Sequence, residues 1–187
     1  MMIGYAFCGS FCTHRRSLEM LKTILGQGYE VIPIMSENVY ATDTRFGAAK
    51  ALIEEVEGLC SHKVIHTIVQ AEPLGPKIKL DALIISPCTG NTLAKIANGI
   101  TDTAVSMSAK AHLRSNRPLV LALASNDALS SNLKNIGALL TRKSVYFVPM
   151  EQDEPIEKPH SLIADFELLP KTLECALEGK QYQKVFK

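Results

Sequence analysis

The chain has 187 residues, of which 47% are hydrophobic and 21% charged, and its 20 basic residues almost balance 19 acidic ones. This length fits one domain that buries its own core, and the composition excludes a disordered chain. The net charge of +1 argues against a general nucleic-acid-binding protein. The five cysteines, an odd number without a Cys-x-x-Cys pair, favour neither a disulfide framework nor a zinc site. Reduced thiols fit the cytoplasm, and no apolar run reaches the roughly 18 residues of a membrane span.

Short apolar segments that do not alternate with polar residues predict parallel strands covered on both faces. These segments are Ile3–Cys8, Val31–Met35, Ala82–Ser86, Leu119–Ala124 and Val145–Val148, with a weaker candidate at Val64–Val69. Apolar residues at helical spacing predict helices between them, over Arg16–Leu25, Phe46–Leu59, Thr92–Ile100, Thr103–Leu113, Ser130–Leu140 and Leu162–Leu177. The alternation predicts a single α/β domain over residues 1–187, a doubly wound parallel sheet in three α/β/α layers.

One segment, Glu151–Pro159, is polar and contains two prolines. We expect an ordered surface loop before the final helix and not a linker between domains. An arm toward a neighbouring subunit, an active-site flap and a solvated connection all remain open for it.

The loop after the first strand lacks both G-x-G-x-x-G and a Walker sequence. It contains Gly9, the hydroxyls of Ser10 and Thr13, and backbone N–H groups at a helix start, which suit a phosphate. Arg15 and Arg16 follow in the first helical turn, where positive charge opposes the helix dipole. A bound anion would offset this unfavourable interaction with the helix dipole. If the arginines point to solvent instead, the interaction remains but costs little free energy.

Three more loops at the carboxyl edge of the predicted sheet are short and polar, namely 36–38, 87–92 and 125–127. In an open parallel sheet, ligands bind at this edge. Thr89 or Asn91 could serve only as a helix cap. Four such turns exceed what capping needs, however, and they predict a polar cleft for a phosphorylated ligand with an uncharged ring, such as FMN.

The segment 87–102 resembles the P-A-S-A-N-T…K-I-A-x-G-x-x-D signature of the FMN-binding superfamily of cysteine decarboxylases and flavin prenyltransferases. The segment 124–128 lies where that superfamily carries P-x-M-N-x-x-M, and the resemblance extends over nearly the whole chain. It implies a flavodoxin-like fold, assembly into trimers or multiples of trimers, and FMN at an interface between copies.

Carried onto this chain, the resemblance implies a set of cofactor-binding residues, with the first four near the flavin phosphate: Gly9, Ser10, Phe11, Ser36, Cys88, Thr89, Asn91 and Thr92. Asn126 is expected to be catalytic and to face the substrate. Arg45 could clamp a dicarboxylate through bidentate hydrogen bonds, although a surface arginine or an inter-subunit ion pair is an alternative. No metal site is expected.

Within the superfamily, further similar segments (44–47, 71–76 and 125–129) imply one component of a two-component oxidoreductase. Its expected reaction is oxidation of dihydrodipicolinate to dipicolinate in the mother cell of a sporulating bacterium, together with a partner protein that binds NADP. The superfamily's decarboxylases carry a catalytic histidine, but His62 and His66 are interpreted here as surface or packing residues, which favours dehydrogenation. The alternatives are an FMN-dependent decarboxylase or flavin prenyltransferase, and a non-catalytic phosphate- or nucleotide-binding partner.

Overall fold

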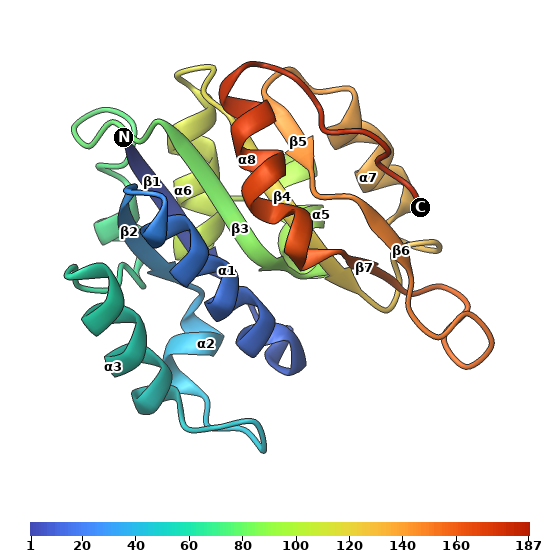
Figure 1. The fold of residues 1–187 in the computed structure, drawn as a ribbon, viewed down its shortest axis with the longest axis horizontal. Helices are drawn as coiled ribbons and strands as arrows, with labels where there is room; N and C mark the ends of the chain where they lie inside the picture. The colour runs from blue at the N-terminus through green and yellow to red at the C-terminus, as the bar shows by residue number, and fades with distance from the viewer.

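The computed structural model describes residues 1–187, and a parallel sheet lies at the centre of the molecule (Figure 1). Five parallel strands stand in the order β2-β1-β3-β4-β5. Their bounds are Met2–Phe7 (β1), Glu30–Met35 (β2), Ala82–Cys88 (β3), Leu119–Ser125 (β4) and Val145–Phe147 (β5). This order is that of a flavodoxin-like doubly wound sheet, so the predicted fold class is confirmed.

Two helical layers cover the sheet. One contains α1 (His14–Gly26), α3 (Ala49–Cys60) and α8 (Leu169–Leu177), and the other contains α5 (Gly90–Asn98), α6 (Ala104–Leu113) and α7 (Leu133–Leu140). Two single-turn helices, α2 (Glu37–Ala41) and α4 (Ile68–Ala71), and two 3-10 turns, Phe11–Thr13 and Phe166–Leu168, complete the helical elements. No helix of the chain has both the length and the apolar character that crossing a membrane requires.

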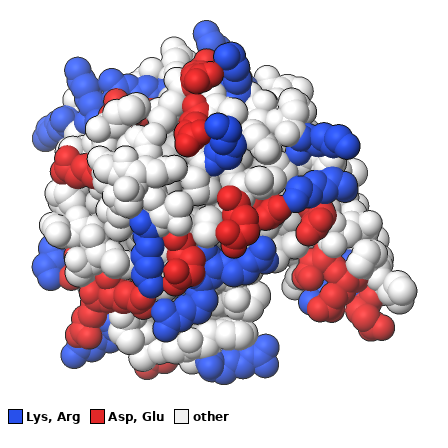
Figure 2. Space-filling model, in the orientation of Figure 1, with Lys and Arg blue, Asp and Glu red and all other residues white.

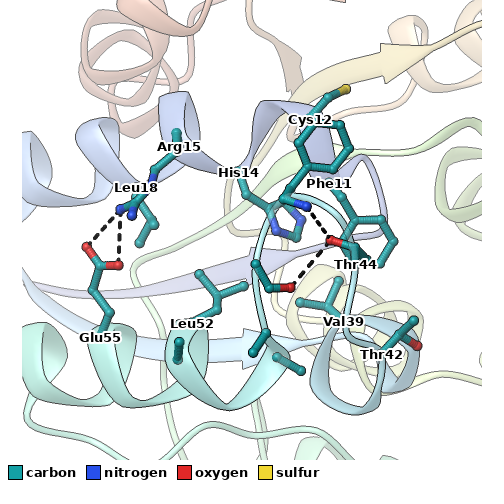
Figure 3. A pocket seen from close by; sticks show the side chains of 15 residues that line it. Phe11, Cys12, His14, Arg15, Leu18, Val39, Thr42, Thr44, Leu52 and Glu55 are labelled. Carbon is teal, nitrogen blue, oxygen red and sulfur yellow. Dashed lines mark hydrogen bonds and ion pairs between the residues drawn. The ribbon is translucent and has the colours of Figure 1, made fainter.

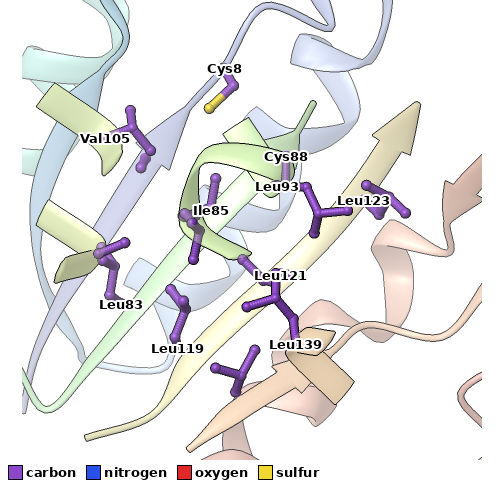
Figure 4. Close-up of a cluster of buried hydrophobic side chains, with 14 of the residues drawn as sticks. Cys8, Leu83, Ile85, Cys88, Leu93, Val105, Leu119, Leu121, Leu123 and Leu139 are labelled. Atoms are coloured by element: carbon purple, nitrogen blue, oxygen red, sulfur yellow. The ribbon is translucent and has the colours of Figure 1, made fainter. Parts of the chain in front are cut away.

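The core consists of two clusters of 24 and 23 buried residues, one on each face of the sheet. Alternate residues of β3 divide between them: Leu83 and Ile85 join the first cluster, and Ala82 and Ile84 the second. Figure 4 shows part of the first cluster, where side chains of β3 and β4 meet those of α5, α6 and α7. Burial on both faces explains why these strands are apolar without alternation.

Two predicted elements are wrong. Val64–Val69 is not a strand, because only Ile65 pairs with the sheet, in an isolated bridge to Ile34, and the one-turn helix α4 begins at Ile68. The predicted helix Leu162–Leu177 begins with strand β7 (Leu162–Ala164), and α8 starts at Leu169. The apolar residues of β7 serve the sheet, since β7 runs antiparallel to the end of β4.

The segment Glu151–Pro159 begins inside a further strand, β6 (Met150–Gln152), which pairs antiparallel with β7. Between the two strands the chain extends beyond the body of the molecule, as Figure 1 shows in orange. We call this ordered hairpin, residues 150–164, the arm, and residues 153–160 are its tip.

Several predicted helices begin at other residues, including α1, which starts at His14 instead of Arg16. The helix expected from Phe46 starts at Ala49, whose N–H donates to Asp43 Oδ1 at 2.8 Å. The helix expected from Ser130 starts at Leu133, and α5 starts at Gly90, two residues before the predicted Thr92. The earlier start of α5 follows from its cap, because Thr89 Oγ1 accepts from the N–H of Thr92.

Candidate functional site

The site lies where the chain leaves β1 and β3, two neighbouring strands whose connections run to opposite faces of the sheet. After β1 the chain forms the 3-10 turn and then α1, in one helical layer, whereas after β3 it forms α5, in the other. This is the topological switch point, at which open α/β sheets leave a crevice for ligands. Gly9 and Thr89 follow the two strand ends and line both of the hollows found there.

The first of these, the Ser36 hollow, has a volume of about 430 Å³ and no hydrophobic lining residue. The predicted residues Ser36, Asn91 and Thr92 line it, beside Lys95 and Asp102. The second, the Asn126 hollow, has a volume of about 440 Å³. The predicted residues that line it are Ser10, Phe11, Arg45 and Asn126.

Cys88 is the one predicted cofactor-binding residue that lines neither hollow, and its predicted role is corrected here. Strand β3 continues through Pro87 to Cys88, so the side chain points into the core and is 0% exposed. Burial raises the pKa of this thiol well above its ordinary value. The Cys88 side chain therefore packs in the core and is not accessible to a ligand.

Helix caps organise the polar loops but leave several amides free. Ser36 Oγ accepts from the N–H of Val39 and Thr89 Oγ1 from that of Thr92, so both residues are N-caps. Thr89 is therefore a helix cap, and it also lines both hollows. The first two amides of α5, at Gly90 and Asn91, and those of Gly9 and Ser10 donate to no protein acceptor. Free amides at a helix start attract an anionic or strongly polar ligand.

The space around Gly9 shows whether the chain itself requires a glycine at this edge of the sheet. A Cβ at Gly9 would contact only Phe11 Cε2, at 3.7 Å. The packing of the chain therefore does not require glycine here. Gly9 lines both hollows, so a ligand at this edge can approach its backbone closely. The site residues thus fit a phosphorylated polar cofactor.

Charges in the Ser36 hollow are mostly engaged by protein partners. Lys95 Nζ lies 2.9 Å from Asp102 Oδ1. Glu37 Oε1 accepts from the N–H of Ala104 at 2.9 Å, which joins α2 to the start of α6. Lys95 is the only cation among the lining residues, against two carboxylates. Binding of a phosphate there would depend on Lys95 and on the free amides.

The Asn126 hollow has its own cation, Arg45, on the loop between α2 and α3. Its guanidinium carbon lies 4.9 Å from the centre of the Phe46 ring, a cation–π contact that orients the side chain. Arg45 forms no ion pair within the chain and lines the same hollow as Asn126. An unpaired arginine beside an exposed amide is suited to bind a carboxylate.

A hydrogen-bond network that no sequence motif indicated fixes the loop of Asn126. Asp127 accepts hydrogen bonds from Ser125 Oγ at 2.5 Å, Ser131 Oγ at 2.8 Å and Asn132 Nδ2 at 2.9 Å. The Ser125 hydroxyl is the main cause that lowers the pKa of Asp127. Asn135 Nδ2 continues the network by donating to Asn132 Oδ1. The sequence feature that could have indicated this network is the pair Asn132 and Asn135, three residues apart at the start of an otherwise apolar helix.

His14 stabilises the loop that follows β1. Its Nε2 lies 2.8 Å from Cys8 O, and its ring packs against those of Phe7 and Phe11. Burial lowers its pKa, so the ring is neutral near neutral pH. Arg15 and Arg16 do not line either hollow: Arg15 pairs with Glu55 at 3.2 Å, and Arg16 lies over the Phe166 ring.

A third, smaller pocket of about 160 Å³ lies beside the Asn126 hollow, between α1, α3 and the loop 42–48. Figure 3 shows Phe11, Leu18, Val39 and Leu52 around it, with the Arg15–Glu55 ion pair at one side. It shares Phe11 with the Asn126 hollow but is mostly apolar.

His62 and His66 take no part in the site. His62 Nε2 lies 3.0 Å from Glu30 Oε1, and His66 stacks on Tyr40 with ring centroids 3.6 Å apart. Neither lines a hollow at the switch point. These contacts agree with their interpretation as surface or packing residues, which stays a prediction.

Comparison with known proteins supports the same fold. The family model described as Flavoprotein matches residues 1–167. The chain belongs to the flavoprotein family. The match includes both strands of the switch point and every candidate site residue.

Individual relatives agree with that assignment. The B subunit of dipicolinate synthase from Bacillus subtilis is 43% identical over 183 residues, which cover 98% of this chain and 92% of the relative. The crystal structure of the same B subunit from Bacillus halodurans is 41% identical, with a TM-score of 0.91 over 100% of this chain and 95% of that one. The flavin prenyltransferase UbiX of Saccharolobus solfataricus is 30% identical over 65% of this chain and 61% of its own length.

Proposed function

We propose that this chain is the flavin-binding component of a dipicolinate synthase. It acts with a nicotinamide-binding partner, the A subunit of the synthase, which carries NADP. Together they oxidise dihydrodipicolinate to dipicolinate in the mother cell of a sporulating bacterium. The observation that carries the proposal is the 43% identity over 98% of the chain to the B subunit of a dipicolinate synthase. The unpaired Arg45 beside Asn126 adds support, since the substrate is a small dicarboxylate.

FMN is the proposed cofactor, held across the switch point. Gly9 and Thr89 would contact its middle part, because they line both hollows. Ser36, Asn91 and Thr92 would bind the polar end in the Ser36 hollow, with the free amides of α5. Ser10 and Phe11 would contact the part that reaches the Asn126 hollow.

The reaction removes two hydrogens from the dihydropyridine ring, one as a hydride and one as a proton that is released to solvent, and leaves an aromatic ring. FMN, when bound, supplies the acceptor for the hydride. Arg45 binds and orients a substrate carboxylate through two parallel hydrogen bonds. Asn126 contacts the substrate ring or its second carboxylate, and Asp127 holds the loop of Asn126 in place. This fixed geometry supplies the orientation that hydride transfer needs.

A second candidate function is that of an FMN-dependent decarboxylase or flavin prenyltransferase, since one relative is a flavin prenyltransferase at 30% identity. The absence of His62 and His66 from the site weighs against decarboxylation. A third candidate, a non-catalytic companion of the nicotinamide-binding partner, would bind a phosphate without flavin chemistry. We also expect the chain to form a homo-oligomer.

The test is a reconstitution with the purified nicotinamide-binding partner, NADP, FMN and dihydrodipicolinate, in which dipicolinate is measured by chromatography. We expect product at a rate that requires this chain and falls roughly 100-fold in Asn126→Ala, the size of effect seen when one positioned donor is removed. An equal rate without this chain would refute the proposal. Carbon dioxide from a thiol substrate, or a prenylated flavin, would instead favour the second candidate.

A further inference from the structure

The tip of the arm carries the most exposed large apolar side chain of the protein. Ile156 is 91% exposed and lies among acidic residues. Figure 2 shows these acidic side chains gathered on the protruding part of the molecule. A single exposed apolar side chain is common on protein surfaces. Here it stands on a charged protrusion and adds nothing to the core of its own chain, so its combination with the surrounding charges, and not its exposure alone, is what a partner surface has to match.

The tip is ordered in advance. Lys158 forms ion pairs with Asp153 at 3.5 Å and Glu154 at 3.1 Å, and its N–H donates to Glu154 O at 2.7 Å. Gln152 Nε2 donates to Pro159 O at 3.1 Å. One lysine against Glu151, Asp153, Glu154 and Glu157 leaves the arm acidic. A preorganised protrusion loses little conformational entropy on docking.

A pocket of complementary character lies on the helical layer of α5, α6 and α7. It has a volume of about 160 Å³, and its lining includes the apolar side chains of Ile96, Ile100 and Leu113. Three cations, Lys110, Arg114 and Arg142, surround these residues, and no acidic residue lines the pocket. None of the three forms an ion pair within the chain. We call this the cationic pocket.

We infer that the arm tip of one copy of this chain docks into the cationic pocket of a second copy. Ile156 enters the apolar centre, and Glu154 and Glu157 meet Arg114 and Arg142 at the rim. The apolar residue and the charges on the tip match those of the pocket in kind and sign. The two surfaces do not touch within one chain, because Ile156 is exposed there.

This contact joins two different surfaces, so it is heterologous. Repeating it adds copies in one direction and closes into a ring where the rotation allows. The inference goes beyond the proposed function, because it names the surfaces through which copies of the chain assemble and is tested without substrate or cofactor.

The experiment measures mass in solution by light scattering and sedimentation for the full chain and two exposed apolar variants. Ile156→Asp is compared with Val69→Asp, since Val69 is 82% exposed on α4, outside both surfaces. We expect an oligomer for the wild type and for Val69→Asp, and self-association weakened roughly tenfold or more for Ile156→Asp. Circular dichroism of each variant checks that it is folded.

A charge exchange identifies the pocket. Reversal at the tip (Glu154→Lys with Glu157→Lys), or at the rim (Arg114→Glu with Arg142→Glu), should dissociate the oligomer, and all four changes together should restore it. A monomeric wild type, an oligomer unaffected by Ile156→Asp, or a fourfold variant that stays dissociated would overturn the inference. Loss of binding to the nicotinamide-binding partner on rim reversal, with self-association intact, would also overturn it, because the pocket would then serve that partner.

Discussion

Gly90, the first residue of α5, packs tightly against the loop of Asn126. A Cβ at Gly90 would lie 2.6 Å from both Asn132 Nδ2 and Asp127 Oδ1, and closer still to Ser125 Oγ. These three groups form the network that fixes the loop of Asn126. Gly90→Ala should therefore push the network away from α5.

The expected cost follows from those contacts. Forcing one methyl group into a closely packed site costs about 1–3 kcal/mol. Displacement of Ser125 also weakens its hydrogen bond to the Asp127 carboxylate, an interaction worth about 1.5–3 kcal/mol. Alanine gains at most about 1 kcal/mol of helix propensity over glycine. We therefore expect Gly90→Ala to lower the free energy of unfolding by roughly 1–3 kcal/mol.

Gly137→Ala is the matched control, because Gly137 lies in α7 and an added Cβ meets nothing within 4 Å. Without a clash, only helix propensity changes, and we expect stabilisation by about 0.5–1 kcal/mol. Urea unfolding followed by circular dichroism measures both variants, and an FMN titration shows whether Gly90→Ala also weakens the site. A Gly90→Ala protein as stable as the wild type would refute the proposed contact between the two loops.

Three further predictions concern charge at the site and in the core. Asn91→Asp adds a third carboxylate to the Ser36 hollow and should weaken FMN binding in a fluorescence titration; equal affinity would exclude this hollow for the phosphate. Arg45→Lys keeps the charge but loses the bidentate geometry, so KM for dihydrodipicolinate should rise in the reconstituted assay, whereas Arg15→Lys should leave it unchanged. His112, on α6, is buried like His14, and its Nε2 lies 2.8 Å from Pro118 O. Burial lowers the pKa of both histidines, so the unfolded state takes up protons before the folded state does, and stability should fall as pH decreases below about 6.5. The His14→Gln, His112→Gln double variant should lose less stability over that range, and equal urea midpoints at about pH 7 and 5 in the wild type would contradict the argument.

The central strands were predictable because their burial on both faces gives continuous apolar runs. Strand β3 illustrates the limit, since the predicted end at Ser86 falls two residues short of Cys88. That difference changed the expected role of Cys88, because a residue inside the buried strand packs its side chain into the core instead of lying in the loop that follows it. Strands β6 and β7 have three residues each, too few for a periodic pattern.

The polar edge of the site was predictable from topology, since parallel strands deliver their following loops to one side. The Asp127 network joins Asp127 to Ser125, Ser131 and Asn132, which all lie within five residues of it. What the sequence could not show is that this network packs against Gly90, which follows another strand. No local pattern around Asp127 shows that contact. The division into two hollows likewise comes from the three-dimensional path of the loops and not from their composition.

The central claim is that the switch point between β1 and β3 binds FMN. The most direct measurement is the visible absorption spectrum of the purified protein after addition of FMN and gel filtration. The account predicts that FMN co-elutes with the protein, shows its visible absorption bands, and is released by heat. The absorbance of these bands should be weaker for Asn91→Asp. Protein that elutes colourless from the same column, while folded by circular dichroism, would contradict the claim.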